Sequence, residues 1–158
     1  MVISLIFVRY DMSLESNMRA LVNNSLFSVM EVEARRLMAF SSEQMTFRQG
    51  DVIFKQGDKS DAGYFILNGS VELRRDHNGQ FVSQIVGRHF LIGEMAMISE
   101  TIRPTSAFAR EKIDCIKISR TVFHKVLREF PDTAITIKRL IEKRVTIVID
   151  QLSNSFSS

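Results

Sequence analysis

Short apolar runs broken by turn residues fill the middle of the chain. From residue 44 onward the runs are interrupted at Gly50-Asp51, Gly57-Asp58, Asn68-Gly69 and Asn78-Gly79. Apolar runs of this length between such pairs predict β-strands, which we place near residues 44–48, 51–55, 62–68, 70–75 and 81–86. Two more strands are predicted near 105–110 and 113–118. The pattern is typical of an all-β barrel or sandwich.

The clearest turn of this region lies at residues 76–79, which read Asp-His-Asn-Gly. Asn-Gly pairs readily adopt the positive φ angles that tight hairpin turns require. We therefore expect the strands before and after this turn to pair with each other as a β-hairpin.

Apolar residues at helical spacing flank the β region on both sides. Ser28 and Glu31 have the spacing of a capping box, and the apolar residues that follow predict a helix over about 29–39. Ser119 is placed to cap a second helix that runs towards Phe130.

A long helix is predicted at the end of the chain. Pro131 suits its first turn, and an apolar stripe recurs in steps of three and four residues, which takes the helix to about residue 152. Other apolar residues, Leu140, Ile147 and Ile149, lie off that stripe, so packing on one face alone would leave apolar surface exposed. A second contact is expected for this helix, although the barrel alone could also cover it.

Length and composition limit the chain to one ordinary globular domain. It has 158 residues, of which 45% are apolar and 25% charged, and its net charge is only +3. Its basic residues are scattered in pairs, which favours solvated surfaces over a nucleic-acid site. The pairs are Arg35-Arg36, Arg74-Arg75, Lys138-Arg139 and Lys143-Arg144. No direct binding of nucleic acid is expected.

Cysteine use and the N-terminal sequence favour a cytoplasmic protein without membrane contact. The one cysteine, Cys115, cannot form an internal disulfide, and its surroundings predict a buried, inert strand residue. The apolar run over residues 1–8 is far shorter than the ~20 residues of a membrane span. Arg9 follows that run, whereas a signal peptide carries its charge before it. We interpret residues 1–25 as an N-terminal extension.

The main candidate for chemistry is the stretch over residues 93–109, in which Glu94 and Arg103 stand in a largely uncharged segment. Gly93 precedes a short apolar helical turn, whose free N–H groups favour an anion. Arg103 can add a planar fork to phosphate oxygens. Glu94 would repel a phosphate unless neutral donors, such as ribose hydroxyls, took up its oxygens. The pattern therefore indicates a sugar phosphate with one negative charge.

This stretch resembles the phosphate-binding cassette of the cyclic nucleotide-binding domain family, found in catabolite-activator-type regulators, cyclic-nucleotide-dependent kinases and cyclic-nucleotide-gated channels. Residues 47–73 resemble the strand and glycine-turn signature of the same family. The likeness covers about residues 26–150. It implies a mainly β fold with flanking helices, a jelly-roll barrel of the double-stranded β-helix type with a long C-terminal helix. The domain is expected over 26–152, followed by a tail over 153–158.

The resemblance also assigns roles within the cassette. Glu94 would accept the ribose 2′-hydroxyl, Arg103 would pair with the cyclic phosphate, and backbone amides around Gly93, Met95 and Ala96 would complete the cradle. Ser106 would lie near the purine or the phosphate. Two structural alternatives remain open at this point. Glu94 and Arg103 could form a plain internal salt bridge, and Ser106 could be a strand residue whose hydroxyl is satisfied locally.

The sequence departs from the family pattern at two places. Relatives usually place a small residue with a free N–H at position 104, whereas Pro104 has no such donor. Many relatives that prefer cyclic GMP carry a threonine there, so Pro104 favours cyclic AMP, and Thr105 is the neighbouring hydroxyl that could compensate. His89 and Phe90 stand upstream where glycine and aspartate are common, and we interpret His89 as a surface or packing residue rather than a ligand-binding group.

The expected function is a non-enzymatic sensor of cyclic AMP that closes its C-terminal helices over the ligand. The histidines have no metal-ligand spacing, and no catalytic motif occurs, so neither a metal nor catalysis is expected. The resemblance implies a homodimer formed through the last helix. Two alternatives stay open: an interaction module with a vestigial pocket, and the regulatory fragment of a transcription factor. The predicted site comprises Gly93, Glu94, Met95, Ala96, Arg103, Pro104, Thr105 and Ser106.

Overall fold

The computed structural model describes residues 13–156, so the apolar run at the start of the chain lies outside the described residues. Residues 13–21 are helical. The remaining elements, in chain order, are α2 (Ser25–Ser28), α3 (Val32–Ser41), β1 (Glu43–Phe47), β2 (Val52–Phe54), β3 (Ala62–Asn68), β4 (Val71–His77), β5 (Gln80–Val86), β6 (Leu91–Ile92), α4 (Glu94–Ile98), β7 (Ser106–Ala109), β8 (Ile113–Ser119), α5 (Arg120–Glu129) and α6 (Pro131–Phe156).

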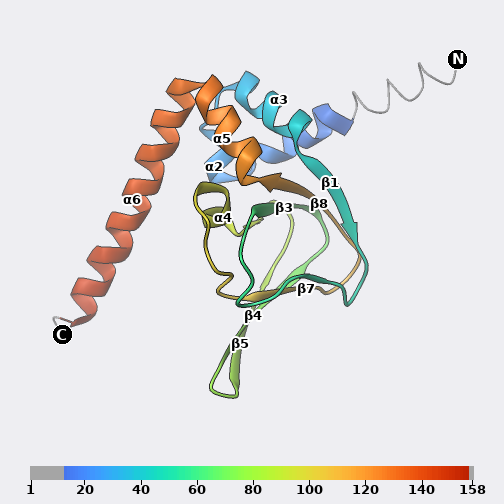
Figure 1. Cartoon of the computed structure of the whole chain (residues 1–158), viewed down its shortest axis with the longest axis vertical. Helices are drawn as coiled ribbons and strands as arrows, with labels where there is room; N and C mark the ends of the chain where they lie inside the picture. Colours follow the sequence, from blue (N-terminus) through green and yellow to red (C-terminus); the bar gives the residue numbers. More distant parts are fainter. Residues whose placement is uncertain (1–12, 157–158) are drawn as a thin grey trace, which may run out of the picture.

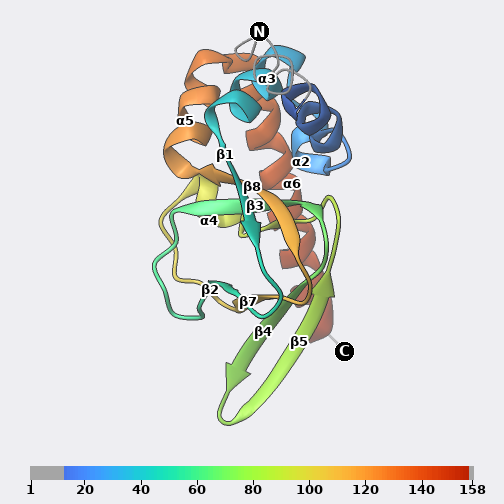
Figure 2. The same ribbon diagram turned by 90° about the vertical axis from the view of Figure 1, so that its right-hand side faces the viewer.

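The strands form two antiparallel sheets of four, which confirms the predicted jelly-roll barrel with flanking helices. One sheet has the order β1-β8-β3-β6 and the other the order β2-β7-β4-β5. Apart from the β4–β5 hairpin, neighbouring strands within each sheet are not consecutive in sequence, as in β3 beside β8. The two sheets enclose the interior of the roll, and the β4–β5 hairpin projects beyond it (Figures 1 and 2).

Strand β3 is buried on both faces and belongs to two hydrophobic cores. Tyr64 and Ile66 point into the roll, where they pack with Phe54 and Cys115. Phe65, on the opposite face of the strand, packs with residues of the flanking helices. Alternate side chains of a strand point to opposite faces, so an uninterrupted apolar run suits a strand covered on both sides.

The helices lie on the outer face of the β3–β8 sheet. Helices α2, α3 and α5 gather at one end of the molecule, and α6 leaves this layer and runs past the roll (Figures 1 and 2). The early turns of α6 are packed, since Ile137 is 2% exposed. Ile147, Ile149 and Leu152 further along the helix are about half exposed. No helix within residues 13–156 combines the length and apolar character needed to cross a membrane.

The seven predicted strands and the predicted hairpin are confirmed. Asn78 and Gly79 have φ angles of 50° and 79°, and His77 pairs with Gln80 across the turn. Strand β6 was not predicted, since its two residues stand in the segment that leads to the cassette. It forms because Leu91 and Ile92 pair with the middle of β3.

The predicted capping box at Ser28 is wrong. Ser28 ends the short helix α2, where its hydroxyl donates to the Ser25 carbonyl, and α3 begins only at Val32. The Glu31 N–H, which a capping box would satisfy locally, donates instead to the Thr133 hydroxyl at 3.2 Å. The hydroxyl of Thr133, in α6, thus accepts the hydrogen bond that the Ser28 hydroxyl was expected to accept.

Candidate functional site

Arg103 is buried inside the roll, at the point where the cassette returns to the sheet. Its side chain is 3% exposed, and Nη2 donates to the Ala62 carbonyl at 2.7 Å. The guanidinium carbon lies 4.0 Å from the centroid of the Phe54 ring, which allows a cation–π contact. The Asp61 carboxylate is 4.0 Å away but mostly exposed, so it compensates little of the lost hydration.

One nitrogen of Arg103, Nη1, is buried without a hydrogen-bond partner among the described residues. Burial lowers the pKa of Arg103, while Tyr64 and Asp61 act in the opposite direction. An arginine side chain nevertheless keeps its charge in proteins. Leaving a buried donor unsatisfied costs about 1–3 kcal/mol, and more for a charged group. The arrangement is therefore suited to an anionic acceptor at Nη1.

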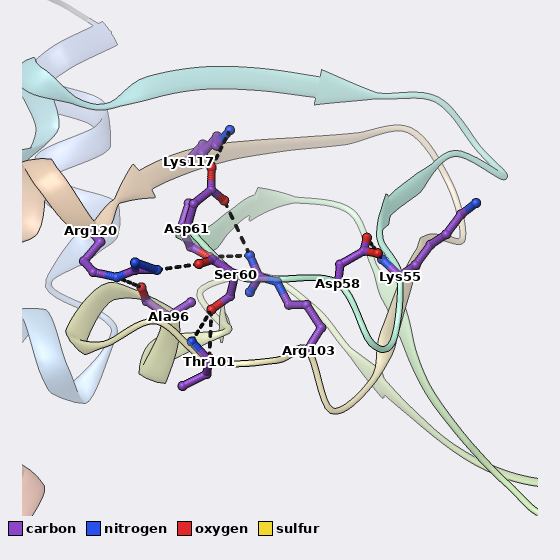
Figure 3. A network of polar contacts seen from close by, with 10 residues as sticks. Lys55, Asp58, Ser60, Asp61, Ala96, Thr101, Arg103, Lys117 and Arg120 are labelled. Carbon is purple, nitrogen blue, oxygen red and sulfur yellow. Dashed lines mark hydrogen bonds and ion pairs between the residues drawn. The ribbon is translucent and has the colours of Figure 1, made fainter.

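The backbone on either side of Arg103 is held by the loop before β3. The Arg103 N–H donates to the Asp58 carbonyl at 2.8 Å, and the Gly57 N–H donates to the Arg103 carbonyl at 2.9 Å. Ser60 and Thr101 are joined through both backbone and side-chain bonds (Figure 3). These contacts fix the point from which the Arg103 side chain enters the roll.

Gly93 lies directly against the Arg103 guanidinium. It is the N-cap of α4 and has φ 76° and ψ 38°, a left-handed conformation that glycine adopts at little cost. A methyl group at this position would stand 2.4 Å from Nη1 of Arg103. The structure thus brings together Gly93 and Arg103, two of the predicted site residues. Of the predicted amides, the Ala96 N–H is already bonded, since it donates to the Gly93 carbonyl at 3.0 Å.

Glu94, the first residue of α4, is not paired with Arg103. Its carboxylate forms an ion pair with Arg144 of α6. The alternative of a plain salt bridge between Glu94 and Arg103 is therefore wrong. Each of these two predicted site residues has its own set of contacts.

The other predicted residues lie at the edge of this site. Met95 and Pro104 are exposed, and Thr105 is partly exposed in the bend that follows Arg103. The Ser106 hydroxyl accepts from the Gln56 N–H at 2.9 Å, so it is used within the protein. Gln56 is fifty positions away in the sequence, so this contact is not the local one of the alternative interpretation, and the hydroxyl can still donate one bond.

Arg120, at the start of α5, connects the cassette to the helical layer. Its Nε donates to the Ala96 carbonyl at 3.1 Å, and its Nη2 donates to the Ser60 carbonyl (Figure 3). Neither Arg120 nor Arg144 was predicted to contact the cassette, and the interpretation of the Lys143-Arg144 pair as solvated surface is wrong for Arg144. Isolated basic residues carry no local signal that separates a structural guanidinium from a solvated one.

His89, in the loop that leads to β6, is a packing residue, one of the two roles expected for it. Its ring stacks on Phe65 with centroids 6.0 Å apart. Its backbone has φ 69°, a conformation that is uncommon outside glycine and that places its carbonyl to accept from Asn24. This contact ties the altered loop to the N-terminal helices rather than to the cassette.

A polar hollow of about 400 Å³ lies between the N-terminal helix and the β1–β8 side of the roll. Asn17, Gln44, Asn68, Arg88 and Asp114 are among its lining residues, whereas none of the predicted cassette residues lines it. In the described part of the chain, no three histidine, cysteine, aspartate or glutamate side chains are grouped so as to hold a metal ion.

A two-sheet roll that buries an arginine against a glycine-led helical turn defines a β-roll domain with a guanidinium in its interior. The sequence model of the cyclic nucleotide-binding domain family matches residues 44–130 of this chain, more than half of its length. The chain therefore belongs to the cyclic nucleotide-binding domain family.

Similar proteins differ widely in size. The lysophospholipase NTE1 of Chaetomium globosum is 34% identical over 116 residues, which cover 72% of this chain but only 8% of that protein. The cyclic nucleotide-binding-like protein of Brucella abortus is 34% identical, with a TM-score of 0.65, over 71% of this chain and 97% of that one. The regulatory domain of Toxoplasma gondii PKA, solved with cAMP, is 18% identical, with a TM-score of 0.70, over 84% of this chain and 49% of that one.

Proposed function

We propose that this chain is a non-enzymatic sensor domain that binds cyclic AMP and passes occupancy to its C-terminal helices. The observation that carries the proposal is the buried Arg103, whose Nη1 lacks a partner among the described residues and lies against Gly93. A cyclic phosphate is the anion that the family binds, and it would satisfy this donor. Glu94, at the start of the same helix, would accept the ribose 2′-hydroxyl.

Cyclic AMP is proposed in preference to cyclic GMP because of Pro104. The proline offers no side-chain hydroxyl where relatives that prefer cyclic GMP often have a threonine, and it has no N–H to donate. Thr105 lies beside Pro104 in the bend, and its hydroxyl could compensate for the donor that Pro104 lacks. The preference between the two nucleotides tests this role of Thr105. No metal is proposed in this site.

The proposed output is a change in the position of α5 and α6. Arg120, the first residue of α5, donates a hydrogen bond to the Ala96 carbonyl of the cassette helix α4. A shift of α4 would therefore be transmitted to α5. A ligand changes such an arrangement only as far as it binds one position more tightly than the other. The exposed Ile147 and Ile149 of α6 support a homodimer formed through this helix. The dimer contact would then respond to the change in helix position.

Isothermal titration calorimetry of the purified chain tests the proposal. We expect saturable binding of cyclic AMP, weaker binding of cyclic GMP, and no binding of linear AMP at the same site. If neither cyclic nucleotide bound at millimolar concentration, the sensor function would be lost.

The second candidate is an interaction module that keeps the fold but has lost the ligand. Pro104 and the Ala96 N–H that is already bonded to Gly93 favour it, because both remove donors from the cradle. The exposed apolar residues of α6 would then serve assembly alone. Full dimerisation without any effect of cyclic nucleotides would support this candidate. A regulatory fragment of a transcription factor stays a prediction that the reading frame beyond Ser158 would test.

No lysophospholipase activity is proposed for this chain. The matched segment is a small part of the Chaetomium globosum enzyme, and the chain has no Gly-x-Ser-x-Gly nucleophile motif. Among the predicted site residues, Glu94 is the one carboxylate that could serve as a general acid or base, and the proposal assigns it to the ribose.

A further inference from the structure

Strand β5 is an open edge of its sheet. It stands at the end of the order β2-β7-β4-β5, so β4 is paired with it on one side only. The β4–β5 hairpin projects beyond the roll (Figures 1 and 2), and residues 80–85 are all exposed. An edge strand presents backbone N–H and C=O groups that can pair with a further strand.

The turn of the hairpin fixes which backbone groups of β5 face outwards. Asn78 and Gly79 both have positive φ, as in a two-residue type I′ turn, so the pair of His77 and Gln80 that flanks them is of the hydrogen-bonded kind. Bonded and non-bonded pairs alternate along an antiparallel ladder. Every second residue of β5 therefore points its N–H and C=O away from β4. These residues are Phe81, Ser83 and Ile85.

The outward groups have no backbone partner elsewhere in the described chain. Within residues 13–156, no backbone hydrogen bond joins residues 81, 83 or 85 to a loop, a helix or another strand. Water satisfies such groups at an exposed edge, and an added strand can replace that water. The edge of β5 is thus free to pair.

Strand β5 also has none of the usual protections of an edge. Natural edge strands are commonly blocked by charged side chains, proline or bulges. Residues 80–86 read Gln-Phe-Val-Ser-Gln-Ile-Val, without a charge or a proline, and their register with β4 has no shift. Phe81, Val82 and Ile85 are 62%, 76% and 56% exposed. A regular, uncharged strand with exposed apolar side chains can accept a neighbour at little cost.

One face of the hairpin is apolar. Phe81 and Ile85 lie on this face, because alternate residues of a strand point to the same side. The Arg74 guanidinium lies 5.0 Å from the centroid of the Phe81 ring, and Glu72 pairs with Arg74 at 3.0 Å. The charges on this face are therefore already matched, and its exposed apolar surface suits apolar side chains.

The opposite face of the hairpin is basic. Arg75 and His77, on β4, line a hollow of about 320 Å³ together with Gln80 and Val82 of β5. Neither Arg75 nor His77 forms an ion pair with another residue of the described chain. The nearest carboxylate in sequence, Asp76, belongs to the other face, since Asp76 is paired with Phe81. This face can therefore attract acidic side chains.

We propose that β5 is a docking strand for an extended peptide of a partner protein, in which apolar and acidic side chains alternate. The peptide adds a fifth strand to the sheet and pairs with the outward backbone groups of β5. Its apolar side chains pack on Phe81 and Ile85, and its carboxylates lie on the opposite face, within reach of Arg75 and His77. The inference is independent of nucleotide binding, because none of these residues belongs to the cassette.

A second copy of the chain suits this edge less well. If two β5 strands paired about Ser83, Gln84 of one copy would lie opposite Val82 of the other, so no carboxylate would reach the basic face. The same pairing would add a second Arg75 to that face. An acidic peptide supplies the charge that both copies lack, and complementary charge favours one partner over another.

Fluorescence anisotropy with a labelled peptide tests the proposal. The probe is the acetylated peptide Thr-Val-Thr-Thr-Glu-Val-Glu-Thr, whose valines would face Phe81 and Ile85. A second peptide carries lysine in place of both glutamates. We expect saturable binding of the glutamate peptide to the purified chain, and about fivefold weaker binding of the lysine peptide.

Two pairs of variants separate the backbone contact from the charge contact. Ser83→Pro removes an outward N–H that β4 does not use, and should weaken binding about tenfold, whereas Ser83→Thr keeps the N–H and should bind like the wild-type chain. Arg75→Gln should bring the affinities of the two peptides close together. Arg110→Gln should leave their difference unchanged, because Arg110 lies at the far end of β4, where its N–H donates to the Ser70 carbonyl.

Amide hydrogen exchange, followed by NMR, locates the bound peptide. Saturation with the glutamate peptide should slow the exchange of the Phe81, Ser83 and Ile85 amides, which exchange quickly in the free chain. The amides of the residues between them are bonded to β4 and should be protected in both states. Support of the fold alone would not produce this alternation, so the measurement decides the question even if Ser83→Pro fails to fold. Circular dichroism of each variant checks its fold.

Several outcomes would overturn the proposal. One is the absence of saturable binding at millimolar peptide. Another is binding that leaves the three outward amides unprotected, since the peptide would then lie elsewhere. Equal affinities for the two peptides would exclude an acidic partner. Masses above that of a dimer, which grow with protein concentration and disappear in Ser83→Pro, would make a second copy the occupant of this edge.

Discussion

Arg103 keeps a full charge in the interior of the roll, where lost hydration must be replaced by protein contacts. The Ala62 carbonyl and the Phe54 ring supply two such contacts, and Gly93 leaves room beside the guanidinium. Nη1 still lacks a partner within the described residues. Burying this unpaired donor costs free energy, and a bound anion would offset that cost by accepting its hydrogen bond. This is the physical basis of the proposed site.

At this scale, Arg103→Ala is expected to weaken cyclic AMP binding by about 2 to 5 kcal/mol, because a desolvated phosphate would lose its charged partner. Calorimetric titration measures the change. Arg110→Ala removes the same charge from an exposed turn position and should leave the affinity unchanged. Equal affinities of Arg103→Ala and wild-type protein would place the phosphate elsewhere.

Burial has the opposite consequence at Cys115, where it keeps the thiol in its neutral form. Its side chain is fully buried in the roll, and this burial raises the pKa of the Cys115 thiol to about 12. The thiolate is the reactive form of cysteine, so the native thiol should be inert at ordinary pH.

We expect the native chain to leave Cys115 unlabelled by Ellman's reagent at about pH 8, whereas unfolding in urea should release one reactive thiol. The native thiol holds its proton to a higher pH than the unfolded one. Its contribution to the free energy of unfolding is therefore full below an unfolded pKa of about 8.5 and is lost as the pH rises from there towards the folded value. Rapid labelling of the folded protein would contradict this account, and Cys115→Ala gives the background signal.

At the scale of elements, the junction of β8 and α5 joins the roll to its helices without a loop. Ser119 ends the strand and is also the N-cap of the helix, where its hydroxyl accepts from the Val122 N–H at 3.1 Å. The next residue, Arg120, fastens the helix to the cassette and to the loop before β3. The start of α5 therefore depends on a local cap and on a long-range contact together.

Ser119→Ala should lower the free energy of unfolding by about 1 kcal/mol, since it removes the acceptor for an otherwise unsatisfied N–H. Urea denaturation followed by circular dichroism measures this loss. Ser119→Asp keeps an acceptor at the N-cap and adds a favourable charge there, so its stability should stay close to that of the wild-type chain. Equal stability of the alanine and aspartate variants would show that the cap contributes nothing measurable.

At the scale of the whole molecule, α6 connects the site to the outside. Its first turns pack in the helical layer, Arg144 reaches the cassette, and Ile147, Ile149 and Leu152 remain about half exposed. Apolar side chains that the protein itself leaves uncovered are available to a partner. A two-fold contact between two α6 helices would place the dimer interface within a few turns of the Glu94 contact.

We expect the wild-type chain to behave as a dimer, with about twice the 18.1 kDa mass of one chain, in light scattering coupled to gel filtration. Ile149→Glu should shift it to the monomer, because a charge would be buried in an apolar contact. Asn154→Glu adds the same charge at an exposed polar position of the helix and should remain dimeric. A monomeric wild-type protein would exclude this interface.

Much of the fold could be predicted because its signals are local. The turn pairs separate the strands, Asn78-Gly79 forms the hairpin, and Ser119 caps its helix. The start of α3 could not be predicted, because the hydroxyl of Thr133 replaces the expected local cap. Strand β6 was not predicted for a similar reason, because it forms only by pairing with the distant strand β3.

For the site, the sequence by itself determined which chemistry is present: a glycine, a carboxylate and a guanidinium at the spacing of a phosphate-binding cassette. Only the tertiary structure decided what each group contacts. Arg103 is buried against Phe54 and Gly93, and Glu94 turns to Arg144, a residue fifty positions away. Residue types and their spacings can be read from the sequence. Burial and the choice of ionic partner arise only when distant segments pack together, because that packing determines from which groups water is excluded.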